Sequence, residues 1–435
     1  MLAILGYLMV VVFMFLIMTK RLTALIALML IPALFAIVGG FTNELGEMAL
    51  TGIKELAPTG VMLMFAILYF GIMIDAGLFD PVVGKILQVV KGDPLKITVG
   101  TAVLVLIISL DGDGTTTYMI TISAMLPLYK RVGMNPLILA SIAVLGNAVM
   151  NITPWAGAMA RVVSALHVEM SDVFVPLIPA MAGGILWVIF TAYVFGLRER
   201  KRLGVIDLEN LDSELIAYAE QAATVEQTGY KRPKLLWVNF GLTVLLMTGL
   251  IMGIMPLQVL FMLGFAIAIM INYPNIDLQK ERISAHAGNV LAVASLVFAA
   301  GIFTGILSGT KMVAAMANSL VSIIPDALGP YFPVITAIVS LPFTFFMSND
   351  AYYFGILPIL AEAASTYGVD SLDIARASLM GPAVHLLSPL VASTYLLVGM
   401  SKVDFGEFQR FAFPWAIGTS VIMILVSIAV GAISL

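Results

Sequence analysis

The chain has no cysteine among its 435 residues, and Asp, Glu, Lys and Arg together make up only 11% of it. The absence of cysteine excludes a disulfide framework, thiolate chemistry and a thiolate metal site. Soluble domains carry about 25% charged residues, so the low charge content excludes a soluble enzyme, a nucleic-acid-binding domain and a disordered chain. Hydrophobic residues replace the charge: they make up 61% of the chain, and the mean hydropathy is +1.05. The composition therefore predicts a protein that lies mostly in lipid.

The motifs of ATP-driven and hydrolytic enzymes are also missing. The sequence contains no phosphate-binding loop, no paired-histidine metal motif and no nucleophile elbow. Neither ATP-driven transport nor hydrolysis has support, and we expect no enzymatic activity and no tightly bound cofactor.

Ten apolar stretches are long enough, or nearly so, to cross a bilayer. The first is read as a retained span because it lacks the basic start and the cleavage site of a signal peptide. Two further apolar segments, 97–129 and 329–361, are each interrupted by a polar cluster and are predicted to form re-entrant hairpins. The ten expected spans are 1–18, 22–41, 58–78, 136–166, 174–197, 235–253, 256–272, 288–308, 374–400 and 411–434.

The basic residues predict the orientation in the membrane. With the N-terminus outside, 18 of the 22 Lys and Arg residues fall on the inner side. This distribution follows the positive-inside rule, and it would fail if either hairpin counted as a full crossing. Both termini are therefore expected outside. The four remaining basic residues are Lys54, Arg161, Lys311 and Arg376.

The polar segment 199–234 divides the chain into two halves, 1–198 and 235–435, each with five spans and one hairpin. An odd number of crossings makes the halves antiparallel. A shift of 235 residues aligns Gly133 with Gly368, Gly146 with Gly381, Thr153 with Ser388 and Pro154 with Pro389. The predicted fold class is an all-α polytopic membrane protein made of two inverted repeats, each with a re-entrant hairpin and a broken helix, and such repeats are typical of secondary transporters.

Each hairpin carries its polar cluster at the expected turn. The first reads Asp111-Gly112-Asp113-Gly114-Thr115-Thr116, and the second reads Ser348-Asn349-Asp350. A charge at membrane depth costs at least ~2.5–3.5 kcal/mol, so it persists only where it is paired, hydrated or used. The alternatives are a solvated loop for the first cluster and a helix N-cap for the second, and the cap is compatible with a binding role.

The two broken spans contain Asn147, Asn151, Thr153 and Pro154 in the first half, and His385, Ser388 and Pro389 in the second. Proline removes a backbone hydrogen bond, and a bound polar solute could satisfy the freed groups. A simple proline kink is the alternative. His385 could carry a proton, orient a carboxylate or be a hydrogen-bonded interior histidine, whereas His167 and His286 are expected in loops. Arg161 could face an anionic substrate or pair with an acid.

These residues together predict a secondary transporter whose site is favourable to anions and also contains carboxylates. Asp111, Asp113 and Asp350 would repel a bare polyanion, but they suit a cation or an anion that is carried with a cation. Amphipathic segments 79–92 and 311–325 follow matching spans and are expected to lie flat in the interface.

Long stretches of the sequence resemble the CitMHS family, the bacterial citrate–divalent metal complex transporters of the ion transporter superfamily. The matching stretches are 65–80 (FAILYFGIMIDAGLFD), 91–96 (KGDPLK), 110–121 (LDGDGTTTYMIT), 124–129 (AMLPLY) and 198–205 (RERKRLGV).

The resemblance implies a proton-coupled symporter of the bacterial cytoplasmic membrane that carries citrate complexed with Mg²⁺ or Ca²⁺. It also implies a homodimer in which a scaffold supports a transport domain that moves as an elevator. Related dicarboxylate transporters have Ser-Asn-Thr at both hairpin tips. Asp113-Gly114-Thr115 and Ser348-Asn349-Asp350 depart from that pattern, which places sodium coupling in doubt and fits proton coupling better.

We expect the substrate to bind between the hairpin tips and the broken spans. An Na⁺/H⁺ or organic-anion antiporter of the same superfamily and a passive anion channel are the alternatives. The expected substrate-binding residues are Thr115, Thr116, Asn147, Asn151, Thr153, Arg161, Ser348, Asn349, His385 and Ser388, and the expected metal or proton residues are Asp111, Asp113 and Asp350.

Overall fold

The computed structural model describes residues 2–19, 21–90, 92–112, 114–205, 229–252, 254–322 and 325–434. Within these ranges the chain is helical and contains no β-strand. Asp113 and most of the expected linker, residues 206–228, lie outside the described residues.

The first half forms nine helices and one short turn. They are α1 (Leu2–Met18), α2 (Ala24–Val38), α3 (Leu45–Asp75), α4 (Asp80–Val90), α5 (Pro94–Ile108), the 3₁₀ turn η1 (Ser109–Asp111), α6 (Gly114–Val132), α7 (Pro136–Met150), α8 (Gly157–Leu166) and α9 (Met170–Leu203).

The second half follows a similar order after the 3₁₀ turn η2 (Pro233–Leu235), except that its broken span forms three helices instead of two and a 3₁₀ turn precedes α15. Its elements are α11 (Leu236–Met252), α12 (Leu257–Asn272), α13 (Ile276–Gly309), α14 (Met312–Val321), the 3₁₀ turn η3 (Asp326–Leu328), α15 (Phe332–Phe346), the π-helical turn η4 (Ala351–Ile356), α16 (Leu357–Ser365), α17 (Ser371–Ser378), α18 (Pro382–His385), α19 (Ala392–Ser401) and α20 (Phe405–Ala429).

Local signals at matching positions start and stop these helices. Gly133 and Gly368 end α6 and the segment after α16 with left-handed φ values of 77° and 78°, which glycine adopts without steric cost. Two residues later, the side chains of Asn135 and Asp370 cap α7 and α17. Equivalent turns therefore introduce the broken helix of each half.

Five described helices are long and apolar enough to cross a membrane: α3, α9, the helix over Pro233–Leu250, α13 and α20. They contain most of the expected spans 58–78, 174–197, 235–253, 288–308 and 411–434. The remaining expected spans are shorter helices, such as α2 with 15 residues, or are interrupted, as at α7–α8 and α17–α19.

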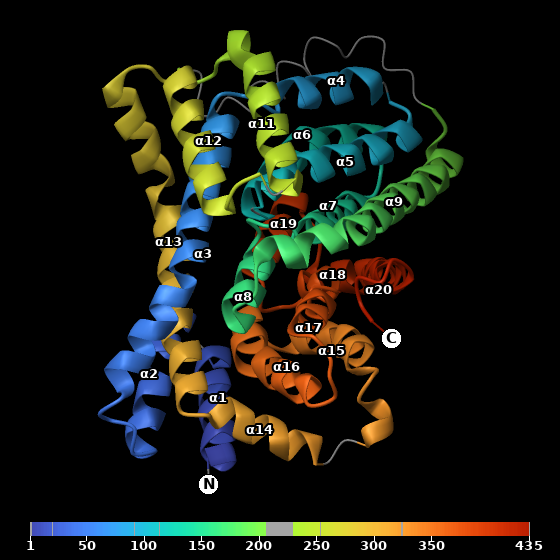
Figure 1. Cartoon of the computed structure of the whole chain (residues 1–435). Helices are drawn as coiled ribbons and strands as arrows, with labels where there is room; N and C mark the ends of the chain where they lie inside the picture. The colour runs from blue at the N-terminus through green and yellow to red at the C-terminus, as the bar shows by residue number, and fades with distance from the viewer. Residues whose placement is uncertain are drawn as a thin grey trace.

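The helices form two groups that lie side by side (Figure 1). The long-helix group comprises α1, α2, α3, α11, α12 and α13. The hairpin group comprises α5–α9 and α15–α20. The expected amphipathic segments are helices α4 and α14, which lie at opposite ends of the molecule (Figure 1).

Helices α3 and α13 form the axis of the long-helix group because glycines bring their backbones into contact. A Cβ atom on Gly52 would lie 2.0 Å from the carbonyl oxygen of Gly301 and 2.9 Å from Cα of Gly305. Small residues at such crossings maximise packing where lipid provides no hydrophobic driving force.

Candidate functional site

The first hairpin consists of α5 and α6, and its tip lies against the break between α7 and α8. Leu110, in the turn after α5, accepts a hydrogen bond on its carbonyl oxygen from Trp155 Nε1 at 2.7 Å. A Cβ on Gly112 would lie 2.8 Å from Trp155 Cδ1, and one on Gly114 would lie 2.8 Å from Asn147 Nδ2. Both glycines are therefore required by the close approach of the tip to the broken helix.

The second hairpin consists of α15 and η4–α16, and its tip lies against the other break. Ser388 Oγ donates a hydrogen bond of 2.6 Å to the carbonyl oxygen of Phe345. Phe345 and Leu110 occupy positions 235 residues apart. In both hairpins, a carbonyl near the end of the first helix therefore accepts a hydrogen bond from a broken helix. Ser348 Oγ accepts a hydrogen bond from the Ala351 N–H at 3.2 Å, which is the expected N-cap.

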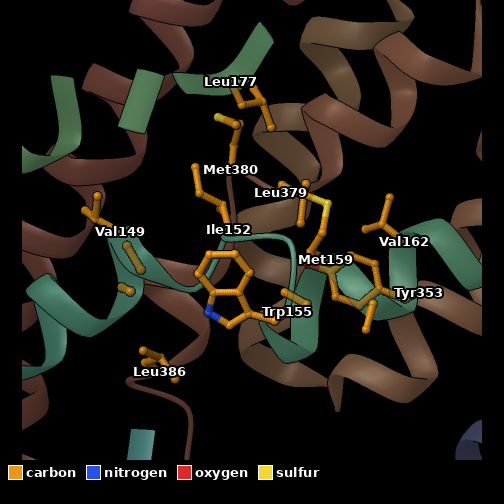
Figure 2. Packing of buried hydrophobic residues seen from close by; sticks show 14 of the residues in the cluster. Val149, Ile152, Trp155, Met159, Val162, Leu177, Tyr353, Leu379, Met380 and Leu386 are labelled. Atoms are coloured by element: carbon orange, nitrogen blue, oxygen red, sulfur yellow. The ribbon is translucent and has the colours of Figure 1, made fainter. Parts of the chain in front are cut away.

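Both broken spans are interrupted at their prolines. Residues 151–156, with Pro154, separate α7 from α8, and residues 386–391, with Pro389, separate α18 from α19. Ile152 of the first break lies near Met380, which follows α17, and Trp155, Leu379 and, from the second break, Leu386 belong to the same cluster of buried side chains (Figure 2). The two breaks therefore belong to one packed region.

Polar groups at the two breaks differ in how they are satisfied. At the second break, Thr394 Oγ1 donates to the carbonyl oxygen of Leu386 at 2.6 Å, and Gln409 Nε2 donates to that of Leu387 at 2.7 Å. At the first break, the buried Thr153 Oγ1 has no hydrogen-bond partner among the described residues. A buried hydroxyl in this state is costly unless a ligand or water serves it.

Arg161 of α8 and Asp350 of the second hairpin form an ion pair across the two halves. Arg161 Nε lies 2.6 Å from Asp350 Oδ1, and Arg161 Nη1 donates to the carbonyl oxygen of Gly157 at 2.8 Å. The side chains retain 22% and 16% of their exposure, so the pair is accessible at one side. Of the two readings of Arg161, pairing with an acid is the one this structure contains.

A cavity of about 280 Å³ borders Arg161 between the two helix groups. Arg161 and Ser164 line it from α8, and Leu296 and Val297 line it from α13. Ser164 Oγ is buried and has no partner within the described ranges. The cavity therefore combines apolar walls with a charged group and a hydroxyl.

Two of the predicted binding residues form hydrogen bonds to helices of the hairpins. Asn147 Nδ2 donates to Tyr118 OH on α6 at 3.0 Å. His385 Nδ1 lies 2.6 Å from the carbonyl oxygen of Thr344 on α15, and since a carbonyl only accepts, Nδ1 carries the proton. The other histidine nitrogen, Nε2, is then the one that could face a ligand.

The remaining predicted residues lie at the same tips and breaks. Thr115 and Thr116 begin α6, Asn151 follows α7, and Asn349 lies at the second tip; all four are half-buried. Asp111 ends the turn η1, and Asp113 falls outside the described residues. No group of three His, Asp or Glu residues is placed to hold a metal ion among the residues searched.

The expectation that His286 lies in a loop is wrong. It lies inside α13, and its Nε2 is 2.9 Å from Oδ2 of the buried Asp75. Arg282 Nη1 approaches the same oxygen at 3.5 Å, and its Cζ lies 3.4 Å from the centroid of the Tyr230 ring. The apolar pattern starts only at 288, whereas the Asn275 cap starts the helix twelve positions earlier.

Trp155 lies at the centre of the packed region of the two breaks, although it is not among the residues that the sequence predicts to bind substrate. Besides its bond to the first hairpin, its ring lies 4.8 Å from that of Phe70 on α3 and 5.7 Å from that of Phe261 on α12. It therefore links a hairpin tip, a break and the long-helix group. One of only four tryptophans, beside a proline in a membrane span, was an available signal.

Two helical hairpins that meet two broken helices, beside a group of long helices, define a polytopic membrane transporter. Solved structures support this fold. Neisseria gonorrhoeae MtrF matches with a TM-score of 0.61 and 15% identity, covering 90% of this chain and 85% of that one. The Alcanivorax borkumensis YdaH transporter matches with a TM-score of 0.55 and 14% identity, covering 90% and 89%.

The chain belongs to the CitMHS family, described as citrate transporters, whose model matches residues 10–381. A Bacillus subtilis (strain 168) protein named "Citrate transporter" is 64% identical over 434 residues, and one named "Mg(2+)/citrate complex secondary transporter" is 55% identical over 436 residues. Both alignments cover 100% of each chain. The protein is therefore a membrane transporter and not an enzyme.

Proposed function

We propose that the protein is a secondary active transporter that carries citrate as a complex with a divalent metal ion, Mg²⁺ or Ca²⁺, in symport with protons across the bacterial cytoplasmic membrane. The proposal is supported by the names of the two relatives, one of which specifies the Mg²⁺–citrate complex. The observation that carries it is the meeting of Asp350 and Arg161, from opposite halves, beside the two breaks.

The chemistry of the site suits a metal-neutralised tricarboxylate. Carboxylate, amide and hydroxyl oxygens are ligands that Mg²⁺ and Ca²⁺ accept. The guanidinium and the backbone N–H groups at the start of α8 favour carboxylates. Ala156, the N-cap residue of α8, has no side chain that could occupy those N–H groups. One site can therefore serve both components of the cargo.

We also propose that the halves 1–198 and 235–435 are inverted repeats. The common order of their elements supports this, as do the left-handed turns at His167 and Lys402, with φ values of 53° and 56° at positions 235 apart. Opposed orientation in the membrane is consistent with the placement of α4 and α14 at opposite ends (Figure 1).

Movement of the hairpin group against the long-helix group would expose the site alternately to the two sides. Both tips and both breaks belong to the hairpin group, so the site would travel as a unit. The Trp155 ring and the cavity lie at the boundary that such an elevator motion would cross. Both termini outside and a homodimer remain part of the proposal.

Uptake of radiolabelled citrate into proteoliposomes tests the function. We expect uptake that requires Mg²⁺ or Ca²⁺, stops on addition of a chelator, and falls when an uncoupler dissipates the proton gradient. Citrate uptake that is indifferent to chelator would refute the complex as substrate. Na⁺/H⁺ exchange without citrate uptake would favour the antiporter, and uptake that never exceeds equilibrium would favour a passive channel.

A further inference from the structure

The ion pair between Arg161 and Asp350 joins residues 189 positions apart, one on a broken helix and the other on a hairpin tip. Arg282 and Asp75 also pair across the two halves, but they lie on α13 and α3, away from the tips and breaks. A pair that spans the two halves at their meeting point holds the binding region together only while it is intact.

We propose that this pair recognises the cargo by exchanging partners with it, an inference that rests on the proposed function. In the structure described here, Arg161 and Asp350 neutralise each other. On binding, a citrate carboxylate replaces Asp350 at the guanidinium, and Asp350 becomes an oxygen ligand of the metal ion in the same complex.

A charge without a partner at membrane depth is costly. Removing one partner of this half-buried pair leaves the other uncompensated. A metal–citrate complex presents both a cation and carboxylates, so both protein charges stay paired throughout. Free citrate would displace Asp350 without compensating it, and a free metal ion would do the same to Arg161. The exchange therefore selects the complex over either component.

The guanidinium of Arg161 retains donors for a second partner. Arg161 makes its described hydrogen bonds through Nε and Nη1. These bonds require at least two of the five guanidinium N–H donors. The cavity of about 280 Å³ lies against the same side chain. A Cβ on Gly157 would lie 2.9 Å from Arg161 Nη1, so this glycine is what lets the guanidinium lie over the start of α8.

The start of α8 favours an anion more than the cation that now lies over it. A helix N-terminus carries partial positive charge, so a guanidinium there is stable only with a negative partner. Asp350 supplies that charge in this structure. A citrate carboxylate could supply it equally and could also reach the buried Thr153 hydroxyl in the break just before α8, which has no partner in the described part of the chain.

Equilibrium binding of radiolabelled citrate to the purified full-length protein tests the exchange, with and without Mg²⁺. In Asp350→Asn, Arg161 loses its competitor, so metal-free citrate should bind several-fold more tightly than in the unsubstituted protein, and Mg²⁺ should add little. In Arg161→Gln, citrate binding should weaken roughly tenfold or more whether or not Mg²⁺ is present. A purely structural pair would not shift the two variants in opposite directions for metal-free citrate.

Lys231→Gln is the matched control, because Lys231 forms an ion pair of 2.8 Å with Asp80 away from the site, and it should bind like the unsubstituted protein. The double variant Arg161→Gln/Asp350→Asn leaves neither charge unpaired but still lacks the guanidinium, so it should bind metal-free citrate as weakly as Arg161→Gln and should not show the tighter binding of Asp350→Asn. Equal weakening of metal-free citrate binding in both single variants would overturn the exchange. Absence of Mg²⁺–citrate binding in the unsubstituted protein would instead refute the proposed function, and this inference with it.

Discussion

At the scale of single residues, the site is held together by side chains that bond to backbone carbonyls. Ser388 and Trp155 donate to the carbonyls of Phe345, near the end of α15, and of Leu110, in the turn after α5, and His385 bonds to the carbonyl of Thr344. Free carbonyls at a helix end in lipid cost several kcal/mol each. These side chains therefore fix the hairpins to the broken helices before any substrate arrives.

Ser388→Ala tests this role. The substitution leaves the Phe345 carbonyl without its side-chain donor. The free energy of unfolding should therefore fall by about 1 kcal/mol, and citrate uptake should decline. Ser388→Thr keeps the hydroxyl and should restore part of both. Ser365, whose Oγ bonds to the Glu362 carbonyl at an exposed position, provides the control Ser365→Ala. Equal stability of the two alanine variants in a thermal unfolding assay would contradict the account.

His167, in the turn between α8 and α9, gives a prediction about pH. Its Nδ1 lies 3.2 Å from Glu55 Oε2, but burial outweighs this attraction and lowers its pKa from the ordinary value. Below about pH 6.5 the unfolded chain binds this proton more readily than the folded one. The folded protein therefore loses free energy of unfolding at His167 as the pH falls below about 6.5.

His167→Asn should remove that loss, since asparagine tolerates the left-handed φ of 53°. As the pH is lowered from 8 to 5, the melting temperature of the variant should rise relative to that of the unsubstituted protein. A relative fall over the same range would mean that the charged pair with Glu55 dominates instead.

At the scale of elements, the re-entrant course of the hairpins stays a prediction, whereas the sequence did indicate helix ends at the polar clusters and prolines that stand out in apolar stretches. It misjudged where α13 begins, since helix caps extend beyond the apolar pattern. The spacing of Gly301, Gly305 and Gly309 indicates a face of α13 that another helix can approach closely. Its partner Gly52 could not be found without knowing which helices pack together.

Gly52→Ala tests that contact. A methyl group there would lie 2.0 Å from the Gly301 carbonyl oxygen, so α3 and α13 must separate, at a cost of about 1–3 kcal/mol. Gly46→Ala on the same helix is the control, because no atom lies within 4 Å of its added Cβ. A thermal unfolding assay should show a lower melting temperature for the first variant alone. Indistinguishable melting temperatures would argue against close backbone contact.

At the scale of the whole molecule, two halves with one order of elements bring their tips and breaks to a common region. Composition and repeats predicted a membrane transporter with such a region. They could not predict which charges pair there, because Arg161 and Asp350 have no local signal that links them. The pairing depends on the packing of α8 against η4, which only the folded chain defines.

A density map of the full-length protein with bound Mg²⁺–citrate would test the central claim most directly. The account predicts the complex between α8 and the second hairpin tip, with a carboxylate at Arg161, the metal at Asp350 and the direct ion pair opened. Density for the complex elsewhere, or at this place with the 2.6 Å pair still intact, would contradict it.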